Sequence, residues 1–522
     1  MDCKIGCSIA FNVFLESSLN FCNAFGGKNE LLAFLRDNVN TVELRSVDSS
    51  CSSDDVLNAV KLLHSYGIKT TIHATLAWAK EFFVPYEKLF SARIQSVYNL
   101  TVHPAQNAEN TKRMLQDVCR AIEENGYPAY ITLENQRKKT ATDFGTCEDV
   151  AQIVKEISSP HLGLCFDFGH QLSNEYKYQT DFLQDEFLKR VKHTHIHSLY
   201  QGVTHYPLHV GETALERNIS ALLQNGYEGV FSLELSPNRY QTIFNEKDAL
   251  VESIHLLKNA IEQVQFKKQI TDFYKNNYLQ TLKNTKRGFD CLENCIALIG
   301  HAGYLIKLGA TRFAVDIAPN NFPISDGAKE FILDWIKDFD GYIVTHEHGD
   351  HYDRKFYQAL PKHLKKFMPD FMNVGGENTQ ATYDGATVLF KDINLSFFES
   401  GHSGGGKSVL EYGFVIERKS RKYVFLGDVR NYAFKYPSFG NVHALFSHLW
   451  LGRRQALVCK ESDYVRDFCS LVNGFHAKEN YIAHFYDVHR PIEDMWSALH
   501  FALIKPHVPN VNMLTSGDLI EL

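Results

Sequence analysis

Residues 1–265 alternate short apolar segments with longer helical patterns, and this alternation restricts the fold more than any other feature of the chain. Eight segments have the length and composition of strands: Lys4–Phe11, Thr41–Val47, Lys69–Ala74, Tyr98–His103, Ala129–Glu134, Leu162–Asp167, Val191–His197 and Gly229–Leu235. Helical patterns lie between them, such as Ser53–Tyr66, Asn107–Asn125, Cys147–Ile157 and Ala214–Gln224. Eight strand–helix units in about 250 residues predict a (β/α)8 barrel. The alternative is an open doubly wound sheet, but the Gly-rich turn that normally follows its first strand is absent from the sequence.

The rest of the chain follows a different rhythm, which begins near Cys295. Strand-like segments come in runs here: Ile296–Ile299, Gly303–Leu308, Thr311–Val315, Ala381–Lys391, Leu395–Glu399, Leu410–Glu417 and Lys422–Leu426. Strands in runs, with helical segments between the groups, predict an α/β domain of stacked sheets covered by helices. Residues 246–290 are charged and helical in pattern. We therefore expect a barrel over residues 1–265, a helical connector over 266–290 and a second domain over 291–522.

Composition bounds the class of protein and its partners. A chain of 522 residues is too long for one hydrophobic core, and 44% hydrophobic with 22% charged residues is typical of a soluble globular protein. The net charge of −7, without a long Lys/Arg cluster, argues against nucleic acid as the main partner, although an acidic protein can still carry a basic groove. We expect a small-molecule substrate, and the formation of a homo-oligomer stays open.

Cysteine usage and hydropathy indicate the compartment. The chain has 11 Cys without a disulfide framework or zinc-ribbon spacing, which is typical of free thiols in a reducing cytoplasm. The N-terminus lacks the pattern of a signal peptide, and no apolar segment reaches the length of about 18 residues needed to cross a bilayer. The sequence therefore predicts a cytoplasmic protein that does not contact a membrane.

Metal-type side chains gather at the ends of the predicted barrel strands. Six of the eight strands end in such a residue: His73, His103, Glu134, Asp167 with His170, His195 and Glu234. Because function collects at the carboxyl ends of barrel strands, we expect these side chains to converge on one metal site. Imidazole and carboxylate ligands suit zinc, manganese, cobalt or magnesium. We place the neighbours His193 and His197 on the opposite face of their strand, in structural roles.

The same segments resemble the xylose-isomerase-like barrel superfamily of sugar isomerases, epimerases and endonuclease IV-type enzymes. The matching words are Thr-Ile-His73-Ala, Val-His103-Pro-Ala, Leu-Glu134-Asn, Cys-Phe-Asp167-Phe-Gly-His170, Thr-His195-Ile-His and Leu-Glu234-Leu. The resemblance implies that Glu134, Asp167, His195 and Glu234 hold a metal, and that the two glutamates move protons beside a substrate carbonyl. The nuclease branch binds three zinc ions and uses an Asp-x-His pair after the seventh strand. His205 and Pro207 stand there in this chain, so the pair is broken, and whether His205 or His209 binds metal stays open.

A second cluster of metal-type residues follows the predicted strand that ends at Thr345. His346, His348, Asp350 and His351 lie within six positions, a spacing that can face two metals about 3.5–4 Å apart. Three further candidates stand at later strand ends, namely His402, Asp428 and His484. His489 is a rival of His484, which we favour because it directly ends an apolar run.

This cluster resembles the signature of the metallo-β-lactamase superfamily, which has an αββα sandwich fold. The resemblance implies that His346, His348 and His402 hold one metal, that Asp350, His351 and His484 hold the other, and that Asp428 bridges them. Upstream, the words around His301 and Asp316 resemble the ascorbate-phosphate-lactonase-like branch. Two metals would lower the pKa of a bridging water, and Asp350 is the predicted catalytic residue of this half.

One motif points elsewhere. Gly401–Ser408 fits the phosphate-loop pattern G-x-x-x-x-G-K-S, but such a loop must open a helix, and the residues that follow are strand-like. We expect its glycines to let the backbone approach the metals and Lys407 to face the substrate.

The sequence thus predicts two fused metalloenzymes of carbohydrate metabolism. The first is a metal-dependent isomerase or epimerase of a sugar or sugar phosphate, and the second is a dinuclear hydrolase of a lactone or phosphoester. We expect Zn²⁺ or Mn²⁺, with two ions in the second half and one to three in the first. The alternatives are a phosphodiesterase or nuclease acting on nucleic acid or nucleotides, and a chain in which one half is a silent binding or scaffold module.

Overall fold

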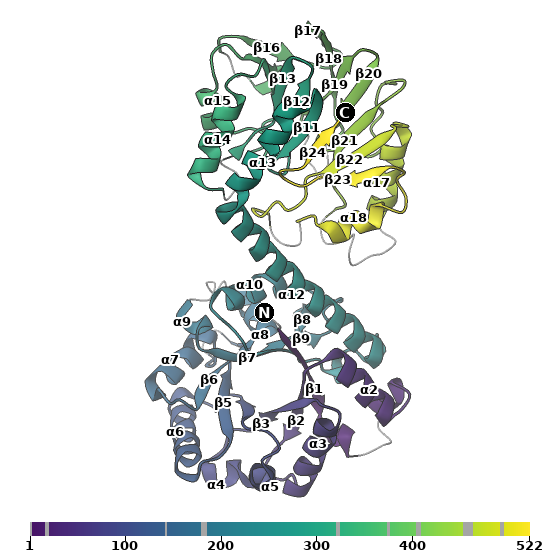
Figure 1. The fold of residues 1–522 in the computed structure, drawn as a ribbon. Helices are drawn as coiled ribbons and strands as arrows, with labels where there is room; N and C mark the ends of the chain where they lie inside the picture. Colours follow the sequence, from purple (N-terminus) through teal and green to yellow (C-terminus); the bar gives the residue numbers. More distant parts are fainter. Residues whose placement is uncertain are drawn as a thin grey trace. The chain divides into compact units, whose positions relative to one another are not determined.

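The computed structural model describes residues 3–15, 20–140, 143–178, 185–319, 324–372, 376–402, 409–452, 463–490 and 495–522. The chain forms two compact units, Met1–Val264 and Gln265–Leu522, and their elements are drawn in Figure 1. No helix among these residues has both the length and the apolar character needed to span a membrane.

The first unit is a closed barrel of eight strands (Figure 1). The strands are β1 (Lys4–Ala10), β2 (Thr41–Val47), β3 (Lys69–Ala74), β4 (Tyr98–Val102), β5 (Ala129–Glu134), β6 (Leu162–Asp167), β7 (Val191–Ile196) and β10 (Val230–Leu233). Every neighbouring pair around the barrel is parallel, so all eight carboxyl ends open at one mouth. The predicted (β/α)8 barrel is confirmed, and four strands agree with the prediction at both ends.

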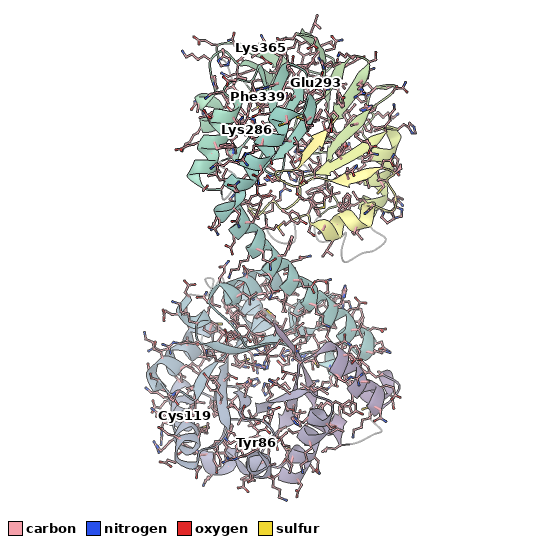
Figure 2. All side chains as sticks on the ribbon, in the orientation of Figure 1. Tyr86, Cys119, Lys286, Glu293, Phe339 and Lys365 are labelled. Carbon is pink, nitrogen blue, oxygen red and sulfur yellow. The ribbon has the colours of Figure 1, made fainter. Side chains whose placement is uncertain are left out.

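Helices cover the outside of the barrel. They are η1 (Phe11–Phe14), α1 (Asn20–Ala24), α2 (Lys28–Asn38), α3 (Ser53–Ser65), α4 (Ala79–Phe82), η2 (Val84–Tyr86), α5 (Glu87–Ala92), α6 (Ala108–Asn125), α7 (Cys147–Ile157), α8 (Phe168–Tyr178), α9 (Asp185–Leu188), α10 (Leu215–Gln224), α11 (Pro237–Tyr240) and the first part of α12 (Glu246–Asn276). Tyr86 and Cys119 lie buried in this helical layer (Figure 2). Local sequence sets the helix ends: the Thr146 side chain accepts from the backbone N–H of Asp149 at the start of α7, and Gly126 ends α6 with φ 62°.

A short hairpin interrupts the strand–helix alternation after β7. It consists of β8 (Ser198–Tyr200) and β9 (Val203–Tyr206), which pair antiparallel. The hairpin lies between β7 and α10 and carries His205 on β9. The sequence analysis did not predict it.

The second unit contains two seven-stranded sheets. The first has the order β16-β15-β14-β13-β12-β11-β24 and the second β17-β18-β19-β20-β21-β22-β23. Their strands are β11 (Asn294–Ile299), β12 (Gly303–Leu308), β13 (Thr311–Val315), β14 (Gly341–Ile343), β15 (Lys365–Pro369), β16 (Thr379–Thr382), β17 (Thr387–Phe390), β18 (Ile393–Glu399), β19 (Tyr412–Arg418), β20 (Arg421–Phe425), β21 (Ala444–His448), β22 (Glu479–Ala483), β23 (Val511–Met513) and β24 (Leu519–Glu521). The helices are α13 (Tyr278–Cys291), α14 (Asp326–Ile336), α15 (Arg354–Ala359), η4 (Asp370–Met372), α17 (Asp463–Gly474) and α18 (Ala498–Ile504).

Three apolar cores show that the unit has four layers. Ile306 and Phe313 of the first sheet pack with Phe397 and Phe446 of the second in the central core. Side chains of α13 and α14 form a second core against the first sheet, and those of α17 and α18 form a third core against the second sheet. Figure 1 shows the helices outside both sheets. The predicted αββα arrangement is therefore present.

Two predicted segments differ in detail. Ala381–Lys391 was expected to be one strand, but Gly385, with φ 81°, turns the chain between β16 and β17, which belong to different sheets. Residues 266–290, expected to be a connector, are largely helical, and Tyr278, Leu282 and Phe289 on α13 lie in a core of the second unit.

Candidate metal centres

Glu134 is the hub of the residues predicted at the barrel mouth. It ends β5, is fully buried, and four imidazoles lie against its carboxylate. The distances from its oxygens are 3.3 Å to Nε2 of His73, 3.3 Å to Nε2 of His103, 3.4 Å to Nδ1 of His170 and 3.1 Å to Nδ1 of His195. Parallel strands bring these side chains together because all of their carboxyl ends meet at one mouth.

The remaining two carboxylates lie beside the same imidazoles. Nδ1 of His195 is 3.3 Å from Oε2 of Glu234, and Nδ1 of His170 is 3.6 Å from Oδ2 of Asp167. All seven predicted residues of the first half are thus gathered in one cluster, which we call the barrel centre: His73, His103, Glu134, Asp167, His170, His195 and Glu234. The surrounding imidazoles keep Glu134 ionised. Burial would raise the pKa of Glu134, but attraction to His103 and His195 outweighs burial and holds that pKa well below the usual value.

Glu43 on β2 is a residue that sequence reasoning missed. It is fully buried, and its carboxylate accepts from Nε2 of His193 at 2.9 Å and lies 3.0 Å from Nε2 of His195. This contact leaves Nδ1 of His195 facing Glu134 and Glu234, so Glu43 orients the ring. The signal in the sequence is a charged residue inside an apolar strand rather than at its end.

The expected face of His193 and His197 was wrong. Residues two apart point to the same face of a strand, and His193 and His195 both reach Glu43. Nδ1 of His197 accepts the backbone N–H of His205 at 2.9 Å, so its Nε2–H donates to Asp167 at 3.0 Å. Both ring nitrogens of His197 are engaged, and His197 therefore positions Asp167 without offering a free lone pair.

The hairpin after β7 decides between His205 and His209. Nε2 of His205 lies 3.4 Å from Oε2 of Glu234, and its ring stacks on His197 at 4.1 Å. Burial lowers the pKa of His205 to about 4, so the ring is neutral at pH 7. His209 instead is exposed and packs edge-on against Phe244. The structure brings His205, and not His209, to the barrel centre.

The predicted residues of the second half form two groups that share Asp428. The first group contains His346, His348 and His402, whose ring centroids are 4.7–4.9 Å apart, together with Asp428. We call these residues, with Asp350, His351 and His484, the sandwich centre. The shared position of Asp428 is the one predicted for a bridging carboxylate.

The second group surrounds the other side of Asp428. Its Oδ1 lies 3.5 Å from Nε2 of His351, 3.7 Å from Nε2 of His484 and 2.8 Å from Nδ1 of His448. Asp350 contacts Nε2 of His484 at 3.2 Å. His448, the last residue of β21, was missed because its sequence context carries no motif. The rival ligand His489 is exposed, whereas His484 is buried.

The tautomers of three imidazoles fit a metal. Nδ1 of His351 contacts Oδ2 of Asp316 at 2.9 Å, Nδ1 of His346 contacts the Thr345 hydroxyl at 3.0 Å, and Nδ1 of His402 donates to the backbone oxygen of Asp428. Nε2 of each ring is buried and has no hydrogen-bond partner among the described residues. In His346 and His402, a proton held on Nδ1 leaves the Nε2 lone pair free for a metal. In His351, burial would lower the pKa, but attraction to Asp428 and the contact with Asp316 outweigh it and raise that pKa well above its usual value, so a metal there would displace the Nε2 proton. The donor set suits Zn²⁺ or Mn²⁺.

Burial keeps two imidazoles of the sandwich centre neutral. It lowers the pKa of His346 and of His484 to about 3, so neither ring has to lose a proton at pH 7 before it binds a metal. Two groups beneath the site were not predicted as partners. They are Asp316, which holds His351, and Glu411, which is fully buried 3.2 Å from Nδ1 of His346.

The described residues test only part of the phosphate-loop motif Gly401–Ser408. Residues 403–408, which include Lys407, lie outside the described part of the chain. The segment that follows forms strand β19, as predicted, and not the helix that a phosphate loop must open.

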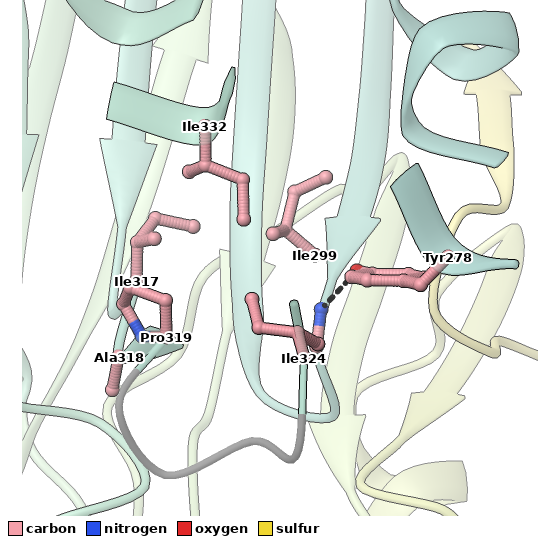
Figure 3. A pocket seen from close by; sticks show the side chains of 8 residues that line it. Tyr278, Ile299, Ile317, Ala318, Pro319, Ile324 and Ile332 are labelled. Atoms are coloured by element: carbon pink, nitrogen blue, oxygen red, sulfur yellow. Dashed lines mark hydrogen bonds between the residues drawn. The ribbon is translucent and has the colours of Figure 1, made fainter. Parts of the chain in front are cut away.

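Two pockets differ in what they can hold. The pocket in Figure 3, lined by Tyr278, Ile299 and Ile332 among others, has a volume of about 10 Å³, enough for one water. The pocket at the barrel mouth has a volume of about 320 Å³ and is lined by His73 and His103 together with Ser46 and Asp48. Only the second is large enough for a small organic molecule.

Comparison with known proteins places the first unit. Residues 38–260 match the family described as xylose isomerase-like TIM barrel. An uncharacterised protein of Methanocaldococcus jannaschii is 26% identical over 182 residues, which are 32% of this chain and 64% of that protein. The chain thus spans less than two thirds of the length of this relative.

Three solved structures show partial similarity to the chain. A D-tagatose 3-epimerase-like protein is 21% identical over 51% of this chain and 99% of its own, with a TM-score of 0.38. The 3-keto-D-glucoside 4-epimerase of E. coli is 14% identical over 49% and 100%, with a TM-score of 0.37. A metallo hydrolase from Ignicoccus hospitalis is 14% identical over 44% and 97%, with a TM-score of 0.34.

Proposed function

We propose that the barrel is a metal-dependent isomerase or epimerase of a sugar or sugar phosphate, and that the second unit is a dinuclear hydrolase of a lactone or phosphoester. The observation that carries both assignments is that each unit surrounds one buried carboxylate with imidazoles, namely Glu134 in the first and Asp428 in the second. Free cysteines among the described residues agree with the proposed cytoplasmic location.

In the barrel, we propose that Glu134, Asp167, His195 and Glu234 hold a divalent metal. The metal would place positive charge beside the carbonyl and hydroxyl oxygens of the substrate. One glutamate removes the proton from the carbon next to the carbonyl, and a proton is then returned to that carbon or its neighbour, so the composition of the substrate is unchanged. Glu134 and Glu234 lie 3.1 and 3.3 Å from Nδ1 of His195, close enough to act on one substrate.

In the second unit, we propose that the sandwich centre holds two divalent metals with Asp428 between them. The pair would supply an activated water and positive charge at the attacked carbonyl or phosphoryl oxygen. The water oxygen forms the new bond, the ester oxygen leaves, and the displaced proton ends on the leaving group. Asp350, beside His484, is the proposed group that holds this proton during transfer.

One observation favours a second function for the barrel. His205 reaches Glu234 although the Asp-x-His pair is broken, and His73 and His103 add two more imidazoles at Glu134. This donor set exceeds what one metal needs and fits a multinuclear phosphodiesterase acting on nucleic acid or nucleotides.

Proton exchange distinguishes the two functions of the barrel. The metal-loaded full chain is incubated in D₂O with ketoses and ketose phosphates, and deuterium beside the carbonyl is measured by NMR. We expect exchange with the wild type, no exchange with Glu134→Gln or Glu234→Gln, and normal exchange with the exposed control Glu186→Gln. If the wild type exchanges no substrate proton but cleaves abasic DNA in a metal-dependent manner, the phosphodiesterase function replaces the isomerase.

A further inference from the structure

Three adjacent parallel strands of the second unit end at the sandwich centre. β20 pairs with β21 and β21 with β22, all parallel, so their carboxyl ends lie at one edge of the sheet. Asp428 follows β20, His448 ends β21 and His484 follows β22. In sheets of this kind, ligands bind beyond the carboxyl ends of the strands, so the next residues of these loops lie where a substrate must enter.

Arg430 and Trp450 occupy that position. Arg430 lies two residues after Asp428, and Trp450 lies two residues after His448. The guanidinium carbon of Arg430 lies 4.5 Å from the centre of the Trp450 ring, which is a cation–π contact. The backbone N–H of Arg430 donates to the oxygen of Gly401 at 2.9 Å, directly before His402. The Tyr432 hydroxyl donates to the backbone oxygen of Trp450. Both residues are therefore held in place against the loops of the sandwich centre.

The charge of Arg430 lacks a counterpart among the described residues. Its buried Nε–H donates to no acceptor among the described residues, and no described carboxylate forms an ion pair with the guanidinium. A nearby arginine behaves differently, because Arg490 pairs with Asp487 at 2.7 Å and with Asp350 at 3.2 Å. Arg430 is half-buried, and its buried Nε–H is a donor without an acceptor; the Trp450 ring supplies charge attraction but no hydrogen-bond acceptor.

We propose that Arg430, supported by Trp450, binds an oxyanion of the hydrolase substrate, so that the second unit acts on an acidic lactone or ester. This inference rests on the proposed hydrolase function. A planar guanidinium offers two parallel N–H groups to a phosphate or carboxylate, which a lysine does not. The Trp450 ring, whose centre lies 4.5 Å from the guanidinium carbon, supports this side chain.

The first experiment compares acidic and neutral substrates with the metal-loaded full chain. Lactones and esters are used in pairs that differ only by a phosphate or carboxylate group. In Arg430→Met we expect the ratio of kcat/KM for the acidic over the neutral member to fall about 10- to 100-fold, the loss of one charge-assisted contact, and in Arg430→Lys to fall less. The control Arg466→Met removes an exposed arginine that pairs with Asp463 and should leave the ratio unchanged. An unchanged ratio in both Arg430 variants overturns the proposal.

The second experiment tests the anion site without any hydrolysis. Inorganic phosphate and acetate are titrated into the same proteins while tryptophan fluorescence is followed, since Trp450 is one of only four Trp in the chain. We expect saturable binding that weakens at least tenfold in Arg430→Met and not in Arg466→Met. The anion that binds more tightly indicates whether the substrate carries a phosphate or a carboxylate group. Equal affinity in wild type and Arg430→Met overturns the anion site. If Arg430-dependent binding is found but no lactone or ester is hydrolysed, the anion site stands and the hydrolase function fails.

Discussion

The contact between Glu43 and His195 leads to a prediction that needs no knowledge of the substrate. Glu43 is fully buried and accepts from Nε2 of both His193 and His195. Burial alone would raise the pKa of Glu43, but attraction to His195 and the hydrogen bonds from His193 and His195 outweigh it and hold that pKa below its usual range. The carboxylate is therefore charged at pH 7, and it fixes which nitrogen of His195 faces Glu134 and Glu234.

Glu43→Gln keeps the shape of the side chain but removes its charge and one acceptor oxygen. The one amide oxygen can still accept from both imidazoles, as Oε2 of Glu43 does, but the negative charge that strengthens these hydrogen bonds is lost. A charge-assisted hydrogen bond contributes about 1.5–3 kcal/mol, and we expect the unfolding free energy of the first unit to fall by that amount. Substituting the hydrogen-bond partner of a metal-binding histidine typically lowers metal affinity about 10- to 100-fold, which corresponds to about 1.4–2.8 kcal/mol.

The assay separates the two centres by removing one of them. Both measurements are made in a His346→Ala, His351→Ala background, which removes a ligand from each group of the sandwich centre, so that metal taken up in competition with a chelator reports on the barrel centre. Urea unfolding followed by circular dichroism reports on stability, and Glu186→Gln, an exposed residue beside Lys189, is the matched control. Unchanged metal affinity together with unchanged stability in Glu43→Gln would refute the role of Glu43 as the group that orients His195.

Three further predictions concern the second unit. Asp316→Asn removes the partner of His351 Nδ1 and should weaken metal binding at the sandwich centre about 10- to 100-fold, measured by chelator competition, while the exposed Asp334→Asn should not. His351→Ala and Asp350→Ala should abolish hydrolysis and leave proton exchange by the barrel intact; equal loss of both activities would instead show one composite site. Burial lowers the pKa of His500 to about 4, below the unfolded value of 6.5, so its contribution to stability is complete above pH 6.5 and is lost as pH falls toward 4. Between pH 6.5 and 5 the wild type should lose about 2 kcal/mol more unfolding free energy than His500→Gln, and parallel urea-unfolding curves would contradict this.

The fold could be predicted from the periodicity of apolar residues, because this pattern is set by neighbouring residues within each strand or helix. Strands such as Ala129–Glu134 and Leu162–Asp167 were found end to end, since a buried parallel strand is a short apolar run between polar turns. The turn at Gly385 was missed although the pair Asp384-Gly385 is a common turn signal. Nothing local shows that β16 and β17 belong to different sheets.

The predicted site residues were strand-end side chains, and parallel topology is sufficient to bring such residues together. The residues that contact these site residues could not be found in the same way. Glu43 lies within β2 and not at its end, and His448 ends a strand whose sequence resembles no motif. His205 could not be placed from sequence, because it depends on a hairpin held by the contact between its backbone N–H and His197.

The sequence by itself determined that the chain forms a barrel and a helix-covered double sheet, and which strand ends carry imidazole and carboxylate groups. These follow from hydrophobic period and residue order, which act over a few neighbouring positions. Only the tertiary structure decided that Glu43 lies behind His195 and that Asp316 holds His351. It also decided that Arg430 rests on Trp450 rather than on a described carboxylate. Each of these contacts joins segments that are distant along the chain, and their distances are set by how strands and sheets pack rather than by any local preference.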